Sequence, residues 1–292
     1  MRPALLDYQE YVQSGQKQQD EYDQQHVADI PFTPGLYPYK IQDKTCFVSY
    51  DAGQTWVPVP VDVQQIDHYV DGNPYYNSLQ EGSYTVSPNK TALLYGGVTT
   101  PLGIVYSNNG EQSWQTATVT GDIEYTEGKF VSFPTQSRGY VAVGYNKTMG
   151  WQQCAIFTTI DGGKTWAYVR EGPGDRPILS FGFVSEDVGF ISYSSPSPEG
   201  SAATKRFDMA RTTDGGVTWQ SVELDIPQDL QPYFSKGMAP YKQEDTLVLL
   251  VGEDPMSDYS AKQDFYLQYT SADEGLTWQY QGPVQIPAYE PG

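Results

Sequence analysis

The chain has 292 residues, of which 36 are acidic and 17 are basic, so its net charge at neutral pH is −19. This charge excludes general binding to nucleic acids and adsorption to anionic membranes, because phosphate groups would be repelled. Two His and two Cys are too few for the usual zinc sites, so we expect neither a metal nor a cofactor. The low content of charged residues, 18%, together with 24 Tyr and 28 Gly, is typical of a folded, β-rich chain.

Residues 1–29 differ in composition from the rest of the chain. They are rich in Gln, and the helical spacing of Leu5, Tyr8 and Val12 predicts a short helix. We interpret this segment as a stalk or linker, with a partner-binding helix as the alternative. No apolar run is long enough for a signal peptide, or for a membrane span of about 18 residues, so the protein is either cytoplasmic or preceded by a missing export or anchor segment. Residues 30–292 are expected to form one domain.

A short phrase recurs five times along this domain and ends each time in a tryptophan. Four copies follow the pattern Ser/Thr-x-Asp-x-Gly-x-Thr-Trp, and successive tryptophans are 52 to 59 residues apart. The second copy is degraded, with Asn109 in place of Asp and Glu111 in place of the second Gly. The defining residues are Asp51 and Trp56, Asn109 and Trp114, Asp161 and Trp166, Asp214 and Trp219, and Asp273 and Trp278.

Each residue type of the phrase has a structural use. An Asp–Gly-rich phrase between two alternating segments is typical of a β-hairpin tip. The Asp carboxylate accepts backbone N–H bonds of the turn, and the Gly adopts positive φ without a Cβ clash. The Trp begins the next strand and covers the gap between neighbouring units. We therefore predict a structural role for all five copies.

The phrase resembles the Asp-box, or BNR repeat, of the sialidase-type β-propellers. The resemblance covers about residues 45–285 and implies an all-β fold of about five four-stranded blades, in which each box joins the third strand to the fourth. The predicted strands are residues 130–134, 139–144, 155–159 and 165–170 in the third blade, and 178–184, 188–193, 206–211 and 218–224 in the fourth. A six-bladed ring with one blade that lacks a box is the competing count.

The first blade is shorter than the others. Residues 36–41 and 45–50 precede its box, and no innermost strand is evident. We expect ring closure by residues 30–33 or by residues 282–287.

In the resembled family the boxes lie on the face opposite the active site. Functional residues are therefore expected in the loops from the second strand to the third and in the connectors between blades. The longest of these loops, residues 61–82, mixes carboxylates with aromatic rings that suit a sugar or a peptide. The alternative is that these tyrosines pack within their own loops. The candidate ligand-binding residues are Asp67, His68, Tyr69, Asp71, Tyr75, Tyr76, Trp151, Arg176, Tyr233 and Tyr259.

Sialidase activity is not expected. The resemblance implies an Arg-Ile-Pro phrase and three convergent arginines, but this chain has Asp29-Ile30-Pro31 and only six Arg. Arg138 and Arg211 fall on the box face, and Arg2 lies in the N-terminal segment. The three arginines that reach the other face come only from the third and fourth blades, and these are Arg170, Arg176 and Arg206.

The leading hypothesis is a non-enzymatic, monomeric binding propeller of the cell envelope or exterior, with a glycan or protein ligand on the loop face. The alternative is a glycoside hydrolase that uses two facing carboxylates on the rim, for which no catalytic residue is assigned. An assembly-factor scaffold like those of photosynthetic complexes is a third reading, which the lack of a basic patch disfavours. Cys46 and Cys154 are expected to be unpaired buried thiols. The rim carboxylates are Asp67, Asp71, Asp122, Glu124, Asp175, Glu253, Asp254 and Asp258.

Overall fold

The computed structural model describes residues 39–66, 78–110, 113–194, 207–253 and 265–285. Within these residues the chain forms five antiparallel sheets and one 3-10 helix, η1 (Val63–Gln65). The predicted N-terminal helix and the predicted closing residues 30–33 lie outside the described residues. None of the described helices is long and apolar enough to cross a membrane.

Each sheet is built from strands that are consecutive in the chain. The first sheet has three strands, β1 (Tyr39–Gln42), β2 (Thr45–Val48) and β3 (Val57–Pro58). The second has β4 (Tyr84–Thr85), β5 (Thr91–Tyr95), β6 (Leu102–Ser107) and β7 (Gln115–Thr120). The third has β8 (Lys129–Ser132), β9 (Gly139–Thr148), β10 (Trp151–Thr159) and β11 (Ala167–Glu171). The fourth has β12 (Ile178–Phe183), β13 (Gly189–Tyr193), β14 (Met209–Thr212) and β15 (Gln220–Ser221). The fifth has β16 (Phe234–Gly237), β17 (Tyr241–Gln243), β18 (Thr246–Glu253), β19 (Phe265–Ser271) and β20 (Gln279–Gln285).

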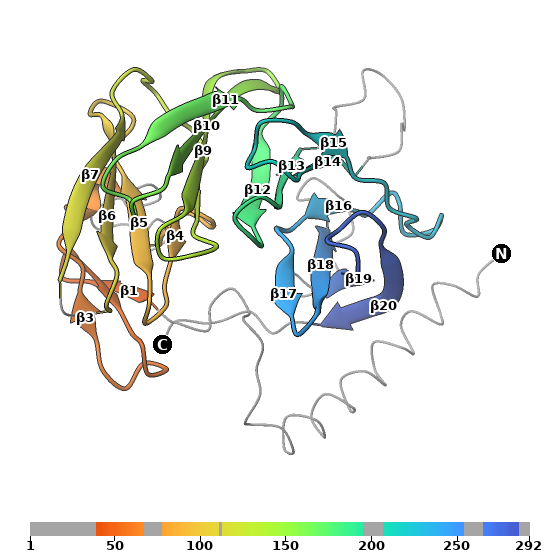
Figure 1. Cartoon of the computed structure of the whole chain (residues 1–292), viewed down its shortest axis with the longest axis horizontal. Helices are drawn as coiled ribbons and strands as arrows, with labels where there is room; N and C mark the ends of the chain where they lie inside the picture. Colours follow the sequence, from red (N-terminus) through yellow and green to blue (C-terminus); the bar gives the residue numbers. More distant parts are fainter. Residues whose placement is uncertain (1–38, 67–77, 111–112, 195–206, 254–264, 286–292) are drawn as a thin grey trace.

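The sheets follow one another around the molecule in chain order, from the orange first sheet through the green third sheet to the blue fifth sheet (Figure 1). The first strands of successive sheets touch one another, β4 against β8, β8 against β12, and β12 against β16. Sheets of consecutive antiparallel strands that meet through their innermost strands form a β-propeller. The predicted fold class is confirmed, and five sheets agree with about five blades.

The hydrophobic core lies between the sheets. Four buried clusters fill the spaces between the first and second, second and third, third and fourth, and fourth and fifth sheets. Strand β9 of the third sheet contributes to two of these clusters, because alternate side chains along a strand point to opposite faces of the sheet. Val141 and Val143 of β9 pack toward the second sheet, whereas Tyr140 and Ala142 pack toward the fourth. Both faces are buried, so the central strands are almost continuously apolar.

Each of the five repeated phrases forms the turn between the last two strands of its sheet, and four of the turns share one set of hydrogen bonds. In the third sheet, Thr165 donates its backbone N–H to Oδ1 of Asp161 at 3.0 Å and its hydroxyl to Oδ2 at 2.6 Å. The hydroxyl of Thr159 donates to Oδ1 at 2.8 Å and accepts the N–H of Gly163 at 3.0 Å. The turns at Asp51, Asp214 and Asp273 repeat these bonds.

The second turn is looser, as its sequence suggests. In this turn a single atom, Oδ1 of Asn109, accepts all three hydrogen bonds. Their donors are the hydroxyl of Ser107 at 3.1 Å and the N–H and the hydroxyl of Ser113, both at 3.2 Å. An amide has one acceptor oxygen where a carboxylate has two, so the second strong hydroxyl bond of the other turns is missing.

The first sheet has no innermost strand among the described residues. The innermost strand of the fifth sheet reaches the second sheet instead, because Nζ of Lys236 in β16 lies 3.1 Å from Oε2 of Glu81, just before β4. The expectation that residues 282–287 close the ring is wrong for residues 282–285, because they belong to β20 and pair with β19 at the outer edge of the fifth sheet.

Candidate functional site

A pocket of about 580 Å³ opens between the third and fourth sheets. One wall is the connector from β11 to β12, and the other is formed by β14, β15 and the end of β13. It opens on the face of the connectors between sheets, which leave the ends of the fourth strands, and it extends along β15 to Trp219, the last residue of the fourth repeated phrase. The lining residues are Gly172, Pro173, Gly174, Asp175, Arg176, Tyr193, Asp208, Ala210, Trp219, Gln220 and Ser221.

The connector is held in place by its own backbone. The N–H of Gly172 donates to the carbonyl oxygen of Cys154 at 2.8 Å, and the carbonyl oxygen of Asp175 accepts the N–H of Gln152 at 2.8 Å. The N–H of Gly174 donates to the hydroxyl oxygen of Tyr193 at 3.1 Å. A Cβ on Gly174 would lie only 2.6 Å from the ring of Tyr193, so only glycine allows this close approach. The wall of the pocket is therefore preformed.

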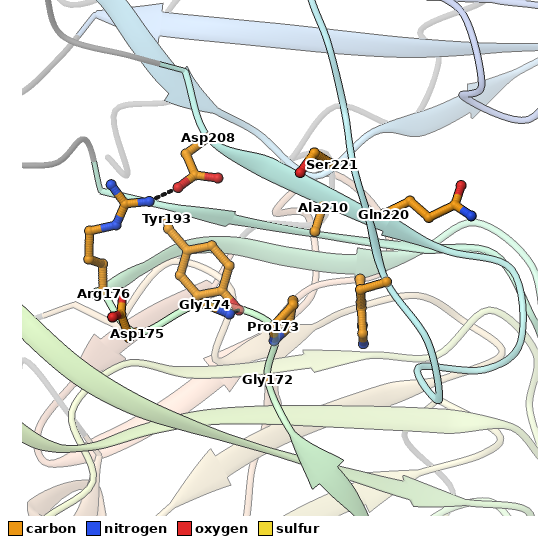
Figure 2. Close-up of a pocket in the computed structure, with 11 residues that line it drawn as sticks. Gly172, Pro173, Gly174, Asp175, Arg176, Tyr193, Asp208, Ala210, Gln220 and Ser221 are labelled. Carbon is orange, nitrogen blue, oxygen red and sulfur yellow. Dashed lines mark hydrogen bonds and ion pairs between the residues drawn. The ribbon is translucent and has the colours of Figure 1, made fainter.

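Arg176 and Asp208 form an ion pair at one end of the pocket (Figure 2). Their side chains are 20% and 33% exposed, so the pair is partly shielded from water. Nε of Arg176 is buried and has no hydrogen-bond partner among the described residues. The exposed carboxylate of Asp175 lies beside the pair in the chain and has no ion-pair partner within the described residues. With two carboxylates and one guanidinium, the pocket carries a net negative charge.

Tyr193 and Cys154 lie behind the glycine connector and remain neutral. Burial raises the pKa of the Cys154 thiol to about 12, and burial also raises the pKa of Tyr193 far above its usual range. Cys154 and Cys46 are both buried and free, as the sequence predicted. These groups therefore contribute packing and a hydrogen bond, and no charge.

The structure brings only part of the predicted set to this face. Arg176 lines the pocket, and Trp151 begins β10, one residue from the Gln152–Asp175 bond. Tyr233 packs against the core between the fourth and fifth sheets and does not line the pocket. The other candidates lie outside the described residues, and these are Asp67, His68, Tyr69, Asp71, Tyr75, Tyr76 and Tyr259.

Most of the described arginines bond to other parts of the propeller and not to the pocket. The expectation that Arg170 reaches the loop face is wrong, because its Nη1 donates to the carbonyl oxygen of Val217 in the fourth repeated turn. Arg138 contacts Tyr140, and Nε of Arg211 donates to the carbonyl oxygen of Glu274 in the fifth turn at 2.7 Å. Arg206 lies outside the described residues. Among the described arginines, Arg176 alone lines the pocket.

Glu253 ends β18 and differs from the other described rim carboxylates. Burial raises its pKa to about 7, and its Oε1 is buried without a hydrogen-bond partner in the part of the chain that the structure describes. A carboxyl group that keeps its proton near neutral pH is a possible general acid. The sequence marked Glu253 as a rim carboxylate but had no signal for its burial.

Two residues that line the pocket had no sequence signal. Tyr193 reads as an apolar strand residue, and Asp208 lies beyond the predicted loops, in the predicted strand 206–211. The run Gly172-Pro173-Gly174 is the local signal that marks the preformed wall. Within the described part of the chain, no group of three His, Cys, Asp or Glu side chains is arranged to hold a metal ion.

The chain matches no known family profile. A stretch of 146 residues, 48% of the chain, is 25% identical to the vacuolar protein sorting/targeting protein 10 of Zygosaccharomyces rouxii and covers 9% of that protein. The GH74 xyloglucanase of Xanthomonas campestris is 17% identical with a TM-score of 0.46, over 84% of this chain and 36% of that one. A variant of the NanB sialidase of Streptococcus pneumoniae is 12% identical with a TM-score of 0.43, over 73% of this chain and 33% of that one. The chain thus spans less than a tenth of the curated relative and about a third of each of these two structures.

Proposed function

We propose that this chain is a non-enzymatic binding propeller whose ligand, a glycan or a protein, occupies the face opposite the repeated turns. The observation that carries the proposal is the preformed pocket with the Arg176–Asp208 ion pair. A rigid connector and a partly shielded charge pair offer polar contacts in one concave site, and Trp219, at the end of the fourth repeated phrase, is an aromatic residue of its lining. The repeated turns are proposed to be Asp-boxes with a structural role, on the other face.

The pocket disfavours anionic ligands. Arg176 is already paired with Asp208, and Asp175 adds a further negative charge, so the guanidinium is not free to bind a ligand carboxylate in the bidentate manner that arginine allows. This supports a neutral or cationic ligand and argues against sialic acid. We also propose that the protein is a monomer of the cell envelope or exterior, on the strength of its likeness to sialidase-type propellers.

Binding to an array of neutral and acidic glycans and of peptides tests this function. We expect ligands that bind without release of reducing sugar, and binding that is weakened by Asp175→Asn. Ile160→Ala, an exposed apolar residue of the third repeated turn, is the matched control and should not change binding. Release of reducing sugar from the bound glycans at ordinary enzymatic rates would overturn the non-enzymatic proposal.

A second candidate, a glycoside hydrolase, is favoured by one observation, the carboxyl group of Glu253 with its pKa of about 7. A general acid of such an enzyme has a raised pKa and works opposite a second, ionised carboxylate. Hydrolysis that disappears in Glu253→Gln would establish this function. If Glu253→Gln leaves any hydrolysis unchanged, Glu253 is not the acid.

A further inference from the structure

Four segments form one continuous surface on the face of the pocket, and we call it the connector rim. They are residues 96–101 between β5 and β6, 121–128 between β7 and β8, 146–152 at the turn of β9 and β10, and 172–177 between β11 and β12. All four lie on the same face, because connections from second to third strands and from fourth to first strands leave the same ends of antiparallel strands.

Hydrogen bonds join each segment of the connector rim to the next. The N–H of Thr126 donates to the carbonyl oxygen of Gly97 at 2.8 Å. Nε2 of Gln152 donates to the carbonyl oxygen of Glu127 at 2.9 Å, and the N–H of Gln152 donates to Asp175 at 2.8 Å. The rim therefore holds its side chains in fixed relative positions and continues directly into the pocket.

Large apolar side chains project from the rim into solvent. Tyr125 is 66% exposed, Met149 is fully exposed, and Val98 and Trp151 are 44% and 41% exposed. Tyr125 also adopts a φ of 55°, which is uncommon for a residue with a side chain. Several exposed apolar groups on adjoining, interlocked loops mark an interaction surface, and aromatic residues and Met are the types enriched in such surfaces.

The charge of the rim is negative and largely uncompensated. Its two cations are already paired, since Nζ of Lys147 lies 2.9 Å from Glu127 and Arg176 pairs with Asp208. The remaining carboxylates, Asp122, Glu124 and Asp175, have no ion-pair partner within the described residues. A partner that carries basic groups between apolar groups would have a charge complementary to that of the rim. Because the whole chain has a net charge of −19, electrostatic attraction would also make such a partner associate faster than a neutral one.

We propose that the connector rim and the adjoining pocket bind a polypeptide segment with alternating basic and apolar side chains. The proposal rests on the binding function proposed above and names its ligand class. The pocket takes a basic side chain at the carboxylate of Asp175, and the apolar side chains lie over Met149 and Trp151. A polypeptide suits this surface better than a glycan. The side chains of Val98 and Met149 provide apolar contacts but no hydrogen-bonding groups for the hydroxyls of a sugar.

The test uses two labelled synthetic peptides, one of alternating Lys and Leu and one of alternating Glu and Leu. The full chain is compared with the double variant Met149→Ala with Trp151→Ala, and with Asp175→Asn. The matched control is Ile160→Ala with Val217→Ala, two exposed apolar residues of the opposite face. All five substituted side chains are exposed at the surface, so every variant is expected to keep the wild-type melting temperature.

We expect the Lys/Leu peptide to bind at least about tenfold more tightly than the Glu/Leu peptide, and to lose about tenfold in affinity in the rim double variant. Asp175→Asn should also weaken binding, whereas the control should bind like the wild type. Equal binding of the two peptides, or an equal loss in the control, would overturn the inference. Glycan binding that depends on the rim, without peptide binding, overturns the inference and leaves the proposed function standing. Binding of neither class overturns both.

Discussion

Nζ of Lys90 lies 2.7 Å from the carbonyl oxygen of Gly162, so a buried side chain of the second sheet is bonded to the repeated turn of the third. The same ammonium donates to Oδ1 of Asn108 at 2.7 Å and lies 3.9 Å from the ring centroid of Phe133. Arg211 makes the equivalent bond from the fourth sheet to Glu274 of the fifth turn, 2.7 Å long. In both cases a cationic side chain of one sheet contacts the residue that follows the Asp of the repeated turn in the next sheet.

Replacing Lys90 by Met tests this link between sheets. The methionine keeps most of the side-chain volume but leaves the carbonyl oxygen of Gly162 without its buried donor, so we expect a loss of about 1–3 kcal/mol in the free energy of unfolding. Urea denaturation measures the loss. Lys164→Met, in the exposed part of the third turn, is the control, and an equal effect in the two variants would contradict the role of Lys90.

The degraded second turn offers a gain of stability. Asn109→Asp supplies the second carboxylate oxygen that the hydroxyl of Ser113 can bond, as Thr165 bonds Asp161 at 2.6 Å. We expect a stabilisation of about 0.5–1.5 kcal/mol, and a loss of similar size in the reverse change, Asp161→Asn. Thermal melting of the two variants checks both signs. A lower melting temperature for Asn109→Asp would show that the second turn is not built like the others.

Trp166 is expected to contribute to packing between the second and third sheets. It packs edge-on against Phe133 at 6.0 Å between ring centroids and donates its indole N–H to the carbonyl oxygen of Gly163 at 3.1 Å. Trp166→Ala should cost about 3 kcal/mol of the free energy of unfolding, at the low end for large aromatics because the ring is only partly buried. Trp151→Ala, an exposed tryptophan, should cost far less in the same denaturation experiment. Near-wild-type stability of Trp166→Ala would refute the packing role.

The raised pKa of Glu253 predicts that the stability of the protein depends on pH. Burial raises the pKa of this carboxyl group from 4.5 to about 7, so between these values the folded state binds more protons than the unfolded state. Its contribution to stability is therefore complete below the unfolded value and is lost as the pH rises through about 7. The melting temperature of the wild type relative to Glu253→Gln should fall over this interval and level off above it. Parallel curves for the two proteins would exclude the shifted pKa.

Much of the fold could be predicted from local sequence. The third sheet was predicted at residues 130–134, 139–144, 155–159 and 165–170, and its strands are Lys129–Ser132, Gly139–Thr148, Trp151–Thr159 and Ala167–Glu171. The alternation of side chains and the Asp–Gly phrase carry this information, because strand and turn depend on neighbouring residues. β9 and β10 extend further than predicted, since they continue to a tight turn beside Trp151.

The candidate site was much less predictable. Arg176 and Asp175 were recognised, but Asp208 and Tyr193 were not, and Arg170 was placed on the wrong face. The residues that line the pocket come from separate segments of the chain: Asp208 lies 32 residues after Arg176, and Ser221 lies 45 residues after it. Their meeting depends on the packing of two sheets, which local patterns do not record.

The sequence by itself determined the repeated unit, the turn that closes each hairpin, the propeller fold with about five blades and the acidic charge. These properties depend on hydrogen bonds and side-chain directions within a few residues of one another. Only the tertiary structure decided which connector meets which sheet and that Lys90 bonds to Gly162. It also decided that the connector rim combines exposed apolar residues with carboxylates that have no ion-pair partner in the described part of the chain. Those contacts join segments brought together by burial between sheets, and their positions follow from the packing of the ring as a whole.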